Sequence, residues 1–151
     1  MSSIKSLLIN SNEVAREVVG DMYKFSLQLT HKTVEVEGAP NYTKQLNDMY
    51  GMIGCERVEH LTLEVADGCV VDLWFDEEGK LKSDKEHEFS IPLIQPNGTI
   101  YDIIIGNCLV TKSNREGDIA SLTDEDIEKV LKYVVNAYGG CFVRCSFNKS
   151  E

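Results

Sequence analysis

Five cysteines and three histidines are the side chains of this 151-residue chain best suited to bind a metal. Cys141 and Cys145 lie four positions apart in a segment that alternates apolar and polar residues, a pattern typical of a strand. Residues four positions apart on a strand are separated by about 13 Å, which is too far for two thiolates to bind one zinc ion at about 2.3 Å. Neither CxxC nor HxxxH occurs in the chain. We therefore expect no metal site and no cofactor.

The same residues do not form a catalytic motif. The chain lacks the GxSxG of serine hydrolases and the phosphate-binding loops GxxxxGK[ST] and GxGxxG. Histidine is the commonest general base, but His60 is expected on the polar side of a strand. We predict a non-enzymatic protein without catalytic residues. A small hydrolase that uses Cys55 or His60 is the alternative.

Acidic residues outnumber basic ones by 25 to 15, which gives a formal net charge of −10. Nucleic acids and anionic membranes attract proteins with a positive field, so we expect neither as a direct partner. The charge permits binding to a basic protein, and it also keeps a small protein soluble. The acidic residues that we predict to bind a partner surround a turn and a sheet edge: Asp76, Glu77, Glu78, Asp84, Glu86 and Glu88.

Trp74 precedes this acidic cluster and is a candidate anchor, because aromatic side chains dominate binding energy at many interfaces. The alternative for Trp74 is a place in the core, where large aromatic side chains bury most area. The alternative for the acidic cluster is a charged edge that prevents aggregation between sheets. Glu116 and Asp118, in a polar loop, are a second candidate for partner binding.

A different hypothesis is a homo-oligomer that captures a nucleotide signal at a subunit interface. Such a protein needs local positive charge despite its negative total. The candidate donors to a phosphate are Arg57, Lys112, Arg115 and Arg144.

The N-terminal sequence has neither the charged segment nor the long apolar segment of a secretory signal. No run approaches the roughly 20 apolar residues that a membrane-spanning helix requires. Five cysteines without a secretory signal indicate reduced thiols, and their odd number is inconsistent with full pairing. These observations predict a cytoplasmic protein.

The apolar run from Ile103 to Val110 predicts a strand buried on both faces, and it crosses Gly106. A helix is expected to begin at Thr123, whose hydroxyl can cap it, with Asp126 placed as in a capping box. Apolar residues then recur on one face of this helix up to Tyr138.

The rest of the chain predicts further helices followed by a meander of strands. Helices are expected over residues 14–29, where apolar residues recur every three or four positions, and over residues 41–50. Strands are expected over the following ranges: 33–37, 57–65, 69–75, 89–94 and 141–147, with a turn at Asp67-Gly68.

This order predicts an α+β fold, a mainly antiparallel sheet with helices packed on one face. We expect a single domain over residues 1–151. It would consist of an N-terminal helical extension, 1–45, and an α+β core, 46–147.

Several segments between Leu46 and Val135 resemble a family. The matching features, in chain order, are Gly51 to Gly54, the strand ending in Trp74-Phe-Asp-Glu-Glu-Gly-Lys-Leu81, Tyr101 to Gly106, and Glu116 to Glu128. They resemble a poorly characterised family of small domains of unknown function, found largely in bacteriophage, plasmid and other mobile-element genomes.

The resemblance implies a genomic setting and supplies no catalytic residues. Small acidic proteins of mobile elements often inhibit host defence. By this analogy we expect an anti-defence protein that binds a bacterial immune effector, such as a CRISPR nuclease, through the effector's basic nucleic-acid-binding surface.

Overall fold

The structure, a computed structural model, describes residues 3–10, 14–19, 22–79, 89–94, 100–139 and 143–149. Its helices are α1 (Tyr42–Ile53) and α3 (Asp124–Gly139). Its strands are β1 (Ser3–Asn10), β2 (Val14–Val19), β3 (Met22–Glu37), β4 (Val58–Ala66), β5 (Cys69–Asp76), β6 (Phe89–Ile94), β7 (Ile100–Ile105), β8 (Cys108–Ser113), β9 (Ile119–Ala120) and β10 (Val143–Lys149).

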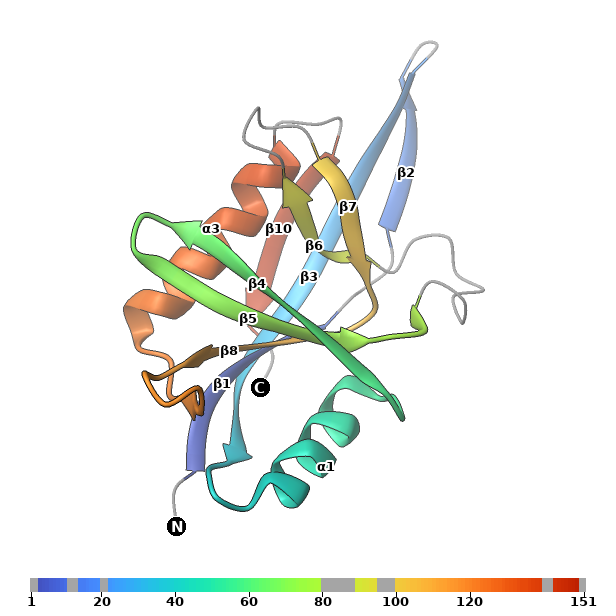
Figure 1. Ribbon diagram of the computed structural model, residues 1–151. Helices are drawn as coiled ribbons and strands as arrows, with labels where there is room; N and C mark the ends of the chain where they lie inside the picture. The colour runs from blue at the N-terminus through green and yellow to red at the C-terminus, as the bar shows by residue number, and fades with distance from the viewer. Residues whose placement is uncertain are drawn as a thin grey trace.

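An eight-stranded sheet dominates the molecule (Figure 1). Its main path runs in the order β10-β3-β1-β8-β5-β4, with β2 paired to β3 and β9 paired to β8, while β6 and β7 form a separate two-stranded sheet. In the described residues, β10 and β3 are parallel and the other strand pairs are antiparallel. The α+β class with a mainly antiparallel sheet is confirmed.

The two helices pack on opposite faces of the large sheet, which corrects the expectation that they share one face. Leu7 of β1 belongs to the core cluster that contains Val130 of α3. The next residue, Leu8, belongs to the cluster that contains Met49 of α1. Successive side chains of a strand point to opposite faces, so α3 and α1 cover different faces. The β6–β7 sheet packs on the same face as α3, because Ile91 belongs to the α3 cluster.

The predicted helix over residues 14–29 is wrong, and so is the helical character of the extension 1–45. The segment forms β2 and the first half of the long strand β3. Phe25, Leu27 and Leu29 alternate with polar residues, so the period of a strand is present beside that of a helix. Pairing of β3 with β1, β2 and β10 decides between the two. The extent of a single domain, 1–151 with its core at 46–147, stays a prediction.

The apolar run through Gly106 forms two strands that belong to different sheets. Gly106 has a φ of +87°, a left-handed conformation that glycine adopts without strain, and the chain passes there from β7 to β8. β8 is buried on both faces as expected: Leu109 belongs to the α1 cluster and Val110 to the α3 cluster.

Other sequence predictions are confirmed. Strands β4 and β5 form a hairpin across Asp67-Gly68, and α1, β6 and β10 occur where a helix and strands were expected. The capping box of α3 is reciprocal. The Asp126 amide donates to Thr123 Oγ1 at 3.1 Å, and the Thr123 amide donates to Asp126 Oδ2 at 2.9 Å.

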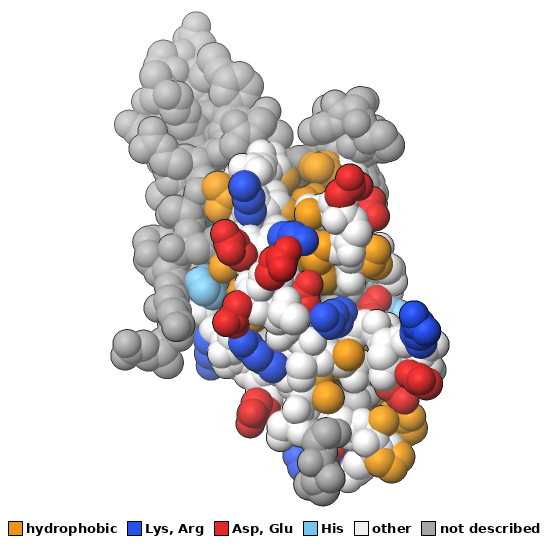
Figure 2. All heavy atoms as spheres, turned by 90° about the vertical axis from the view of Figure 1, so that its left-hand side faces the viewer, with side chains coloured by type: hydrophobic (Ala, Val, Ile, Leu, Met, Phe, Trp, Pro, Cys, Tyr) orange, Lys and Arg blue, Asp and Glu red, His pale blue; other side chains and the backbone are white. Residues whose placement is uncertain are grey.

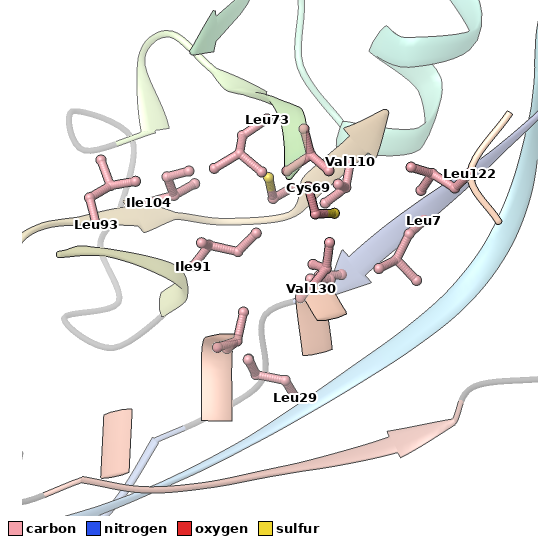
Figure 3. Packing of buried hydrophobic residues seen from close by; sticks show 14 of the residues in the cluster. Leu7, Leu29, Cys69, Leu73, Ile91, Leu93, Ile104, Val110, Leu122 and Val130 are labelled. Atoms are coloured by element: carbon pink, nitrogen blue, oxygen red, sulfur yellow. The ribbon is translucent and has the colours of Figure 1, made fainter. Parts of the chain in front are cut away.

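Figure 3 shows the core between the large sheet and α3, where Leu73 and Val110 of the sheet lie near Val130 of the helix. The exposed fraction of Leu73 and of Val110 is 0%. This packing holds β5 against β8 and α3, and β5 leads to the site described below.

Replacing Leu73 by alanine should lower the free energy of unfolding by about 2–5 kcal/mol, because the buried side chain leaves a cavity. Val70 lies on the same strand and is 49% exposed, so Val70→Ala should cost less than about 1 kcal/mol. Urea unfolding of the two variants checks this. Equal losses would contradict the placement of the core.

Candidate functional site

A hollow of about 200 Å³ lies between the end of the β4–β5 hairpin and the β6–β7 sheet. Four acidic residues line it: Glu59, Asp76, Glu77 and Asp102. Its apolar lining includes Leu61, Phe75, Leu93 and Ile104. We call this hollow the acidic pocket.

Strand register positions the side chain of Glu59 and brings the end of β5 beside it. Glu59 has the same parity on β4 as Leu61, so its side chain lies on the face that packs toward α3 and β6–β7. Asp76 lies opposite Val58 at the end of β5, next to the Glu59–Phe75 pair. The pairing of β4 with β5 therefore brings together acidic residues that are far apart in the sequence.

Hydrogen bonds from backbone amides fix the segments that contain the other acidic residues of the pocket. The Glu78 amide donates to Asp76 Oδ1 at 2.9 Å, and the Glu77 amide donates to the Arg57 carbonyl at 3.1 Å. Across the hollow, Asp102 Oδ1 accepts a hydrogen bond from the Ile103 amide at 2.9 Å. The side chains of Asp76, at the end of β5, and Asp102, within β7, thus each accept a hydrogen bond from a nearby backbone amide, whereas the side chains of Glu59 and Glu77 are exposed.

The chemistry of this pocket suits the side chain of lysine or arginine. Both have an apolar stem that packs on hydrophobic surface and a cationic end that carboxylates bind by charge-assisted hydrogen bonds. Among the described residues, no group of three or more His, Cys, Asp or Glu side chains is arranged to hold a metal ion.

The structure brings together only part of the predicted acidic cluster. Asp76 and Glu77 line the acidic pocket, and Glu78 is half-buried in the adjoining turn. Asp84, Glu86 and Glu88 lie outside the described residues.

Sequence reasoning missed Glu59 and Asp102. The sequence did contain a sign of Glu59's position. Glu59 is two and four residues from Leu61 and Leu63, so in a strand its charged side chain lies on the same face as these apolar ones. Asp102 gave no such signal, because its neighbourhood depends on how the two sheets pack.

Trp74 lies on the face of β5 opposite to the acidic pocket. It packs against the α1 cluster, its Nε1 donates to Thr111 Oγ1 at 2.8 Å, and its ring stacks on that of His60 with centroids 4.5 Å apart. Trp74 is thus partly buried against this core cluster, and its predicted role as an anchor for a partner stays a prediction. His60 is exposed on this stack, and Cys55 packs against the α1 cluster.

The second acidic pair lies in the loop between β8 and β9. Glu116 is exposed, and Asp118 Oδ1 accepts a hydrogen bond from the Tyr42 hydroxyl at 2.8 Å, which ties the loop to α1. This bond raises the pKa of Tyr42. Neither Glu116 nor Asp118 lines the acidic pocket.

The candidate phosphate donors are dispersed. Arg57 precedes β4 at one edge of the large sheet, and Arg144 lies on β10 at the other edge. The side chain of Arg144 lies outside the described residues. Arg115 is exposed in the loop after β8, and Lys112 Nζ is 2.8 Å from Asp126 Oδ2 of α3.

Asp126 links three elements through one carboxylate. Besides the ion pair with Lys112 and the capping of Thr123, its Oδ1 lies 3.8 Å from Cys69 Sγ. Partial burial by itself raises the pKa of Asp126, but hydrogen bonds from Lys112 and Thr123 outweigh it and lower the pKa to about 2. Burial, followed by the nearby charge of Asp126, raises the pKa of the Cys69 thiol, which disfavours a reactive thiolate there.

Acid should remove the stabilisation that Asp126 provides. Its folded pKa of about 2 lies below the ordinary value of 3.8, so the unfolded chain takes up the proton first. The contribution is complete above about pH 5 and is lost as the pH falls through 4 toward 2. Lys112→Met should make the free energy of unfolding less dependent on pH in this window, as measured by urea unfolding.

Other carboxylates titrate in the same window, so the control is Lys132→Met, a loss of charge on the exposed side of α3. An equal dependence on pH in the two variants would contradict a stabilising Lys112–Asp126 pair.

No helix among the described residues has the length and apolar character needed to span a membrane. Comparison with curated proteins and with solved structures finds no match. A family model described as a domain of unknown function (DUF3846) matches residues 29–135. The match confirms the resemblance to a family of unknown function and begins in β3, upstream of the expected start near residue 46. With most of its length matched, the chain belongs to this DUF3846 family.

Proposed function

We propose that this domain is a non-enzymatic binding protein whose acidic pocket receives a lysine or arginine side chain of a basic partner protein. The observation that carries the proposal is the pocket itself, a hollow of about 200 Å³ whose lining combines four acidic residues with apolar ones. An evenly solvated acidic surface would not combine a hollow with a hydrophobic lining. The combination matches the two parts of a long basic side chain.

The net charge of −10 supports the same kind of partner. A negative field accelerates the approach of a basic surface and repels nucleic acid. The contacts in the pocket would then hold the complex, because a charge-assisted hydrogen bond in a partly desolvated site is stronger than a bond between neutral groups.

The specific partner that we propose is a bacterial defence protein that handles nucleic acid, such as a CRISPR nuclease. Its nucleic-acid channel is basic by necessity, since it must bind a phosphate backbone. A domain that occupies this channel would inhibit the effector. The proposal places the protein in the cytoplasm of a bacterial host and assigns it to the anti-defence proteins of phages and other mobile elements.

The positions of the alternative candidates support binding over catalysis. His60 is engaged in a ring stack, and Cys55 packs with the α1 cluster, on the face opposite to the acidic pocket. The dispersed positions of Arg57, Lys112 and Arg144 give the nucleotide-sponge hypothesis no comparable site.

The double variant Glu59→Lys/Glu77→Lys should weaken binding of a fluorescent oligo-arginine peptide by about tenfold or more, since about 1.4 kcal/mol corresponds to a tenfold change in affinity. Both residues are exposed rim residues, so folding should persist. Fluorescence anisotropy at two salt concentrations measures the Kd.

The matched control is Glu35→Lys/Glu128→Lys, which makes the same change in net charge at exposed positions outside the pocket. It should change the Kd by less than about threefold, through long-range attraction alone. Equal weakening in the two double variants would show that overall charge, and not the pocket, binds the peptide.

Inhibition of a defence nuclease is tested separately from peptide binding. Target cleavage by a CRISPR nuclease, measured with each protein in excess, should be blocked by the parent and the control variant but not by the pocket variant. Inhibition that survives in the pocket variant would overturn the role of the acidic pocket in defence inhibition.

A further inference from the structure

Strand β4 is the last strand on its side of the large sheet. In the described part of the chain it pairs with β5 alone. Its other edge therefore presents backbone donors and acceptors that no described strand satisfies. Native proteins usually protect such an edge, or use it to bind an extended segment.

A second hollow, of about 390 Å³, lies further along the same strand. Val65 and Ala66 of β4, Ile94 of β6 and the exposed side of α3 line it. Leu93 lines the acidic pocket and Ile94 lines this second hollow, so the two hollows lie along one seam between β4 and β6. Figure 2 looks onto the hairpin tip and α3, where hydrophobic side chains are exposed between basic and acidic ones.

The second hollow carries positive charge in a protein that is strongly negative overall. Lys129 and Lys132 of α3 line it, together with Asn136. Lys129 lies 3.0 Å from Glu125 one helical turn away, whereas Lys132 is exposed and forms no ion pair with a described residue. The Tyr133 hydroxyl donates to the Pro92 carbonyl at 3.0 Å and holds α3 against β6. We call this hollow the basic pocket.

We propose that the edge of β4 and the two pockets form one docking groove for an extended segment of a partner protein. The segment adds a strand to β4, places a basic residue in the acidic pocket and places an acidic residue beside Lys132. The acidic end of the groove rests on the function proposed above, whereas the sheet edge and the basic pocket are independent of it.

Strand geometry sets the spacing of the partner's charges. Glu59 and Val65 mark the two pockets and are six residues apart on β4, a distance of about 20 Å along a strand. An even separation puts both charges of the added strand on one face, the face toward the pockets. The ladder of β4 is irregular between Glu64 and Ala66, so the regular edge ends at the basic pocket.

A second copy of this chain that paired through its own β4 would not supply the matching charges. Strand β4, Val58–Ala66, contains no lysine or arginine. Pairing between two β4 edges would therefore leave both acidic pockets without a cation. Charge complementarity favours a foreign segment.

The test uses the full-length isotope-labelled protein and a seven-residue peptide with arginine first, glutamate last and alternating threonine and valine between them. A second peptide has the two charged residues exchanged, because a strand can add in either direction. At least one of them should shift the backbone amide resonances of β4. A peptide with glutamine at both ends, and one with alternate amides N-methylated, should bind at least about tenfold more weakly, since each removes one part of the recognition.

Variants of the protein test the contribution of the basic pocket separately from that of the acidic pocket. Lys132→Glu should weaken binding of the charged peptide by about tenfold and leave binding of the glutamine peptide unchanged. Arg115→Glu, an equal charge change in an exposed loop outside both pockets, is the control and should have little effect.

Each further outcome has a definite meaning. If oligo-arginine binds the acidic pocket but neither strand peptide shifts the β4 amides, the docking groove is wrong and the proposed function stands. If the strand peptides bind through β4 and Lys132 but Glu59→Lys/Glu77→Lys has no effect, the acidic end is wrong. A free protein that sediments as a dimer with its β4 amides protected from exchange would place a second copy in the groove and overturn the proposal.

Discussion

The burial of β8 on both faces is the constraint on which the rest of the structure depends. Leu109 points into the α1 cluster and Val110 into the α3 cluster, and neither is exposed to solvent. Such a strand has to be central, flanked by β1 and β5, with a covering layer on each side. The buried polar residue of β8, Thr111, fits this environment because its hydroxyl accepts a hydrogen bond from Trp74.

The acidic pocket follows from how the chain enters β8. Gly106 allows the turn by which β7 leaves the plane of the large sheet and joins β6 in a second layer. This turn places Asp102 and Ile104 opposite the end of the β4–β5 hairpin. Without the separation of β7 from β8, the apolar run would continue as one strand, and the carboxylates of β4 and β5 would face no opposing wall.

Local patterns in the sequence predict the elements whose signals are unambiguous. The hairpin of β4 and β5 and the helix capped by Thr123 carry a turn dipeptide and a capping box, both of which act within a few residues. Residues 14–29 carry both the helical and the strand period, so long-range pairing of β3 decides their structure. The face on which each helix packs is also set by tertiary contacts, which no local pattern encodes.

The site was predictable only in the part that is continuous in sequence. Asp76 and Glu77 stand out as a run of charge, whereas Glu59 joins them through the register of β4 and β5. The basic pocket was harder still to predict, because lysines are common on the exposed side of a helix. Lys129 and Lys132 form a pocket only because the fold places them beside Val65 and Ile94.

Net charge and local charge act at different steps of recognition. A total of −10 determines which molecules approach, and it acts over roughly one Debye length, about 8–10 Å at physiological salt. It does not determine how a partner is oriented once in contact. Orientation requires opposite charges at a fixed separation, and the seam between β4 and β6 has Glu59 at one end and Lys132 at the other. A partner selected by total charge alone binds in many registers, whereas one that fits both ends is held in one register by the spacing of residues on β4.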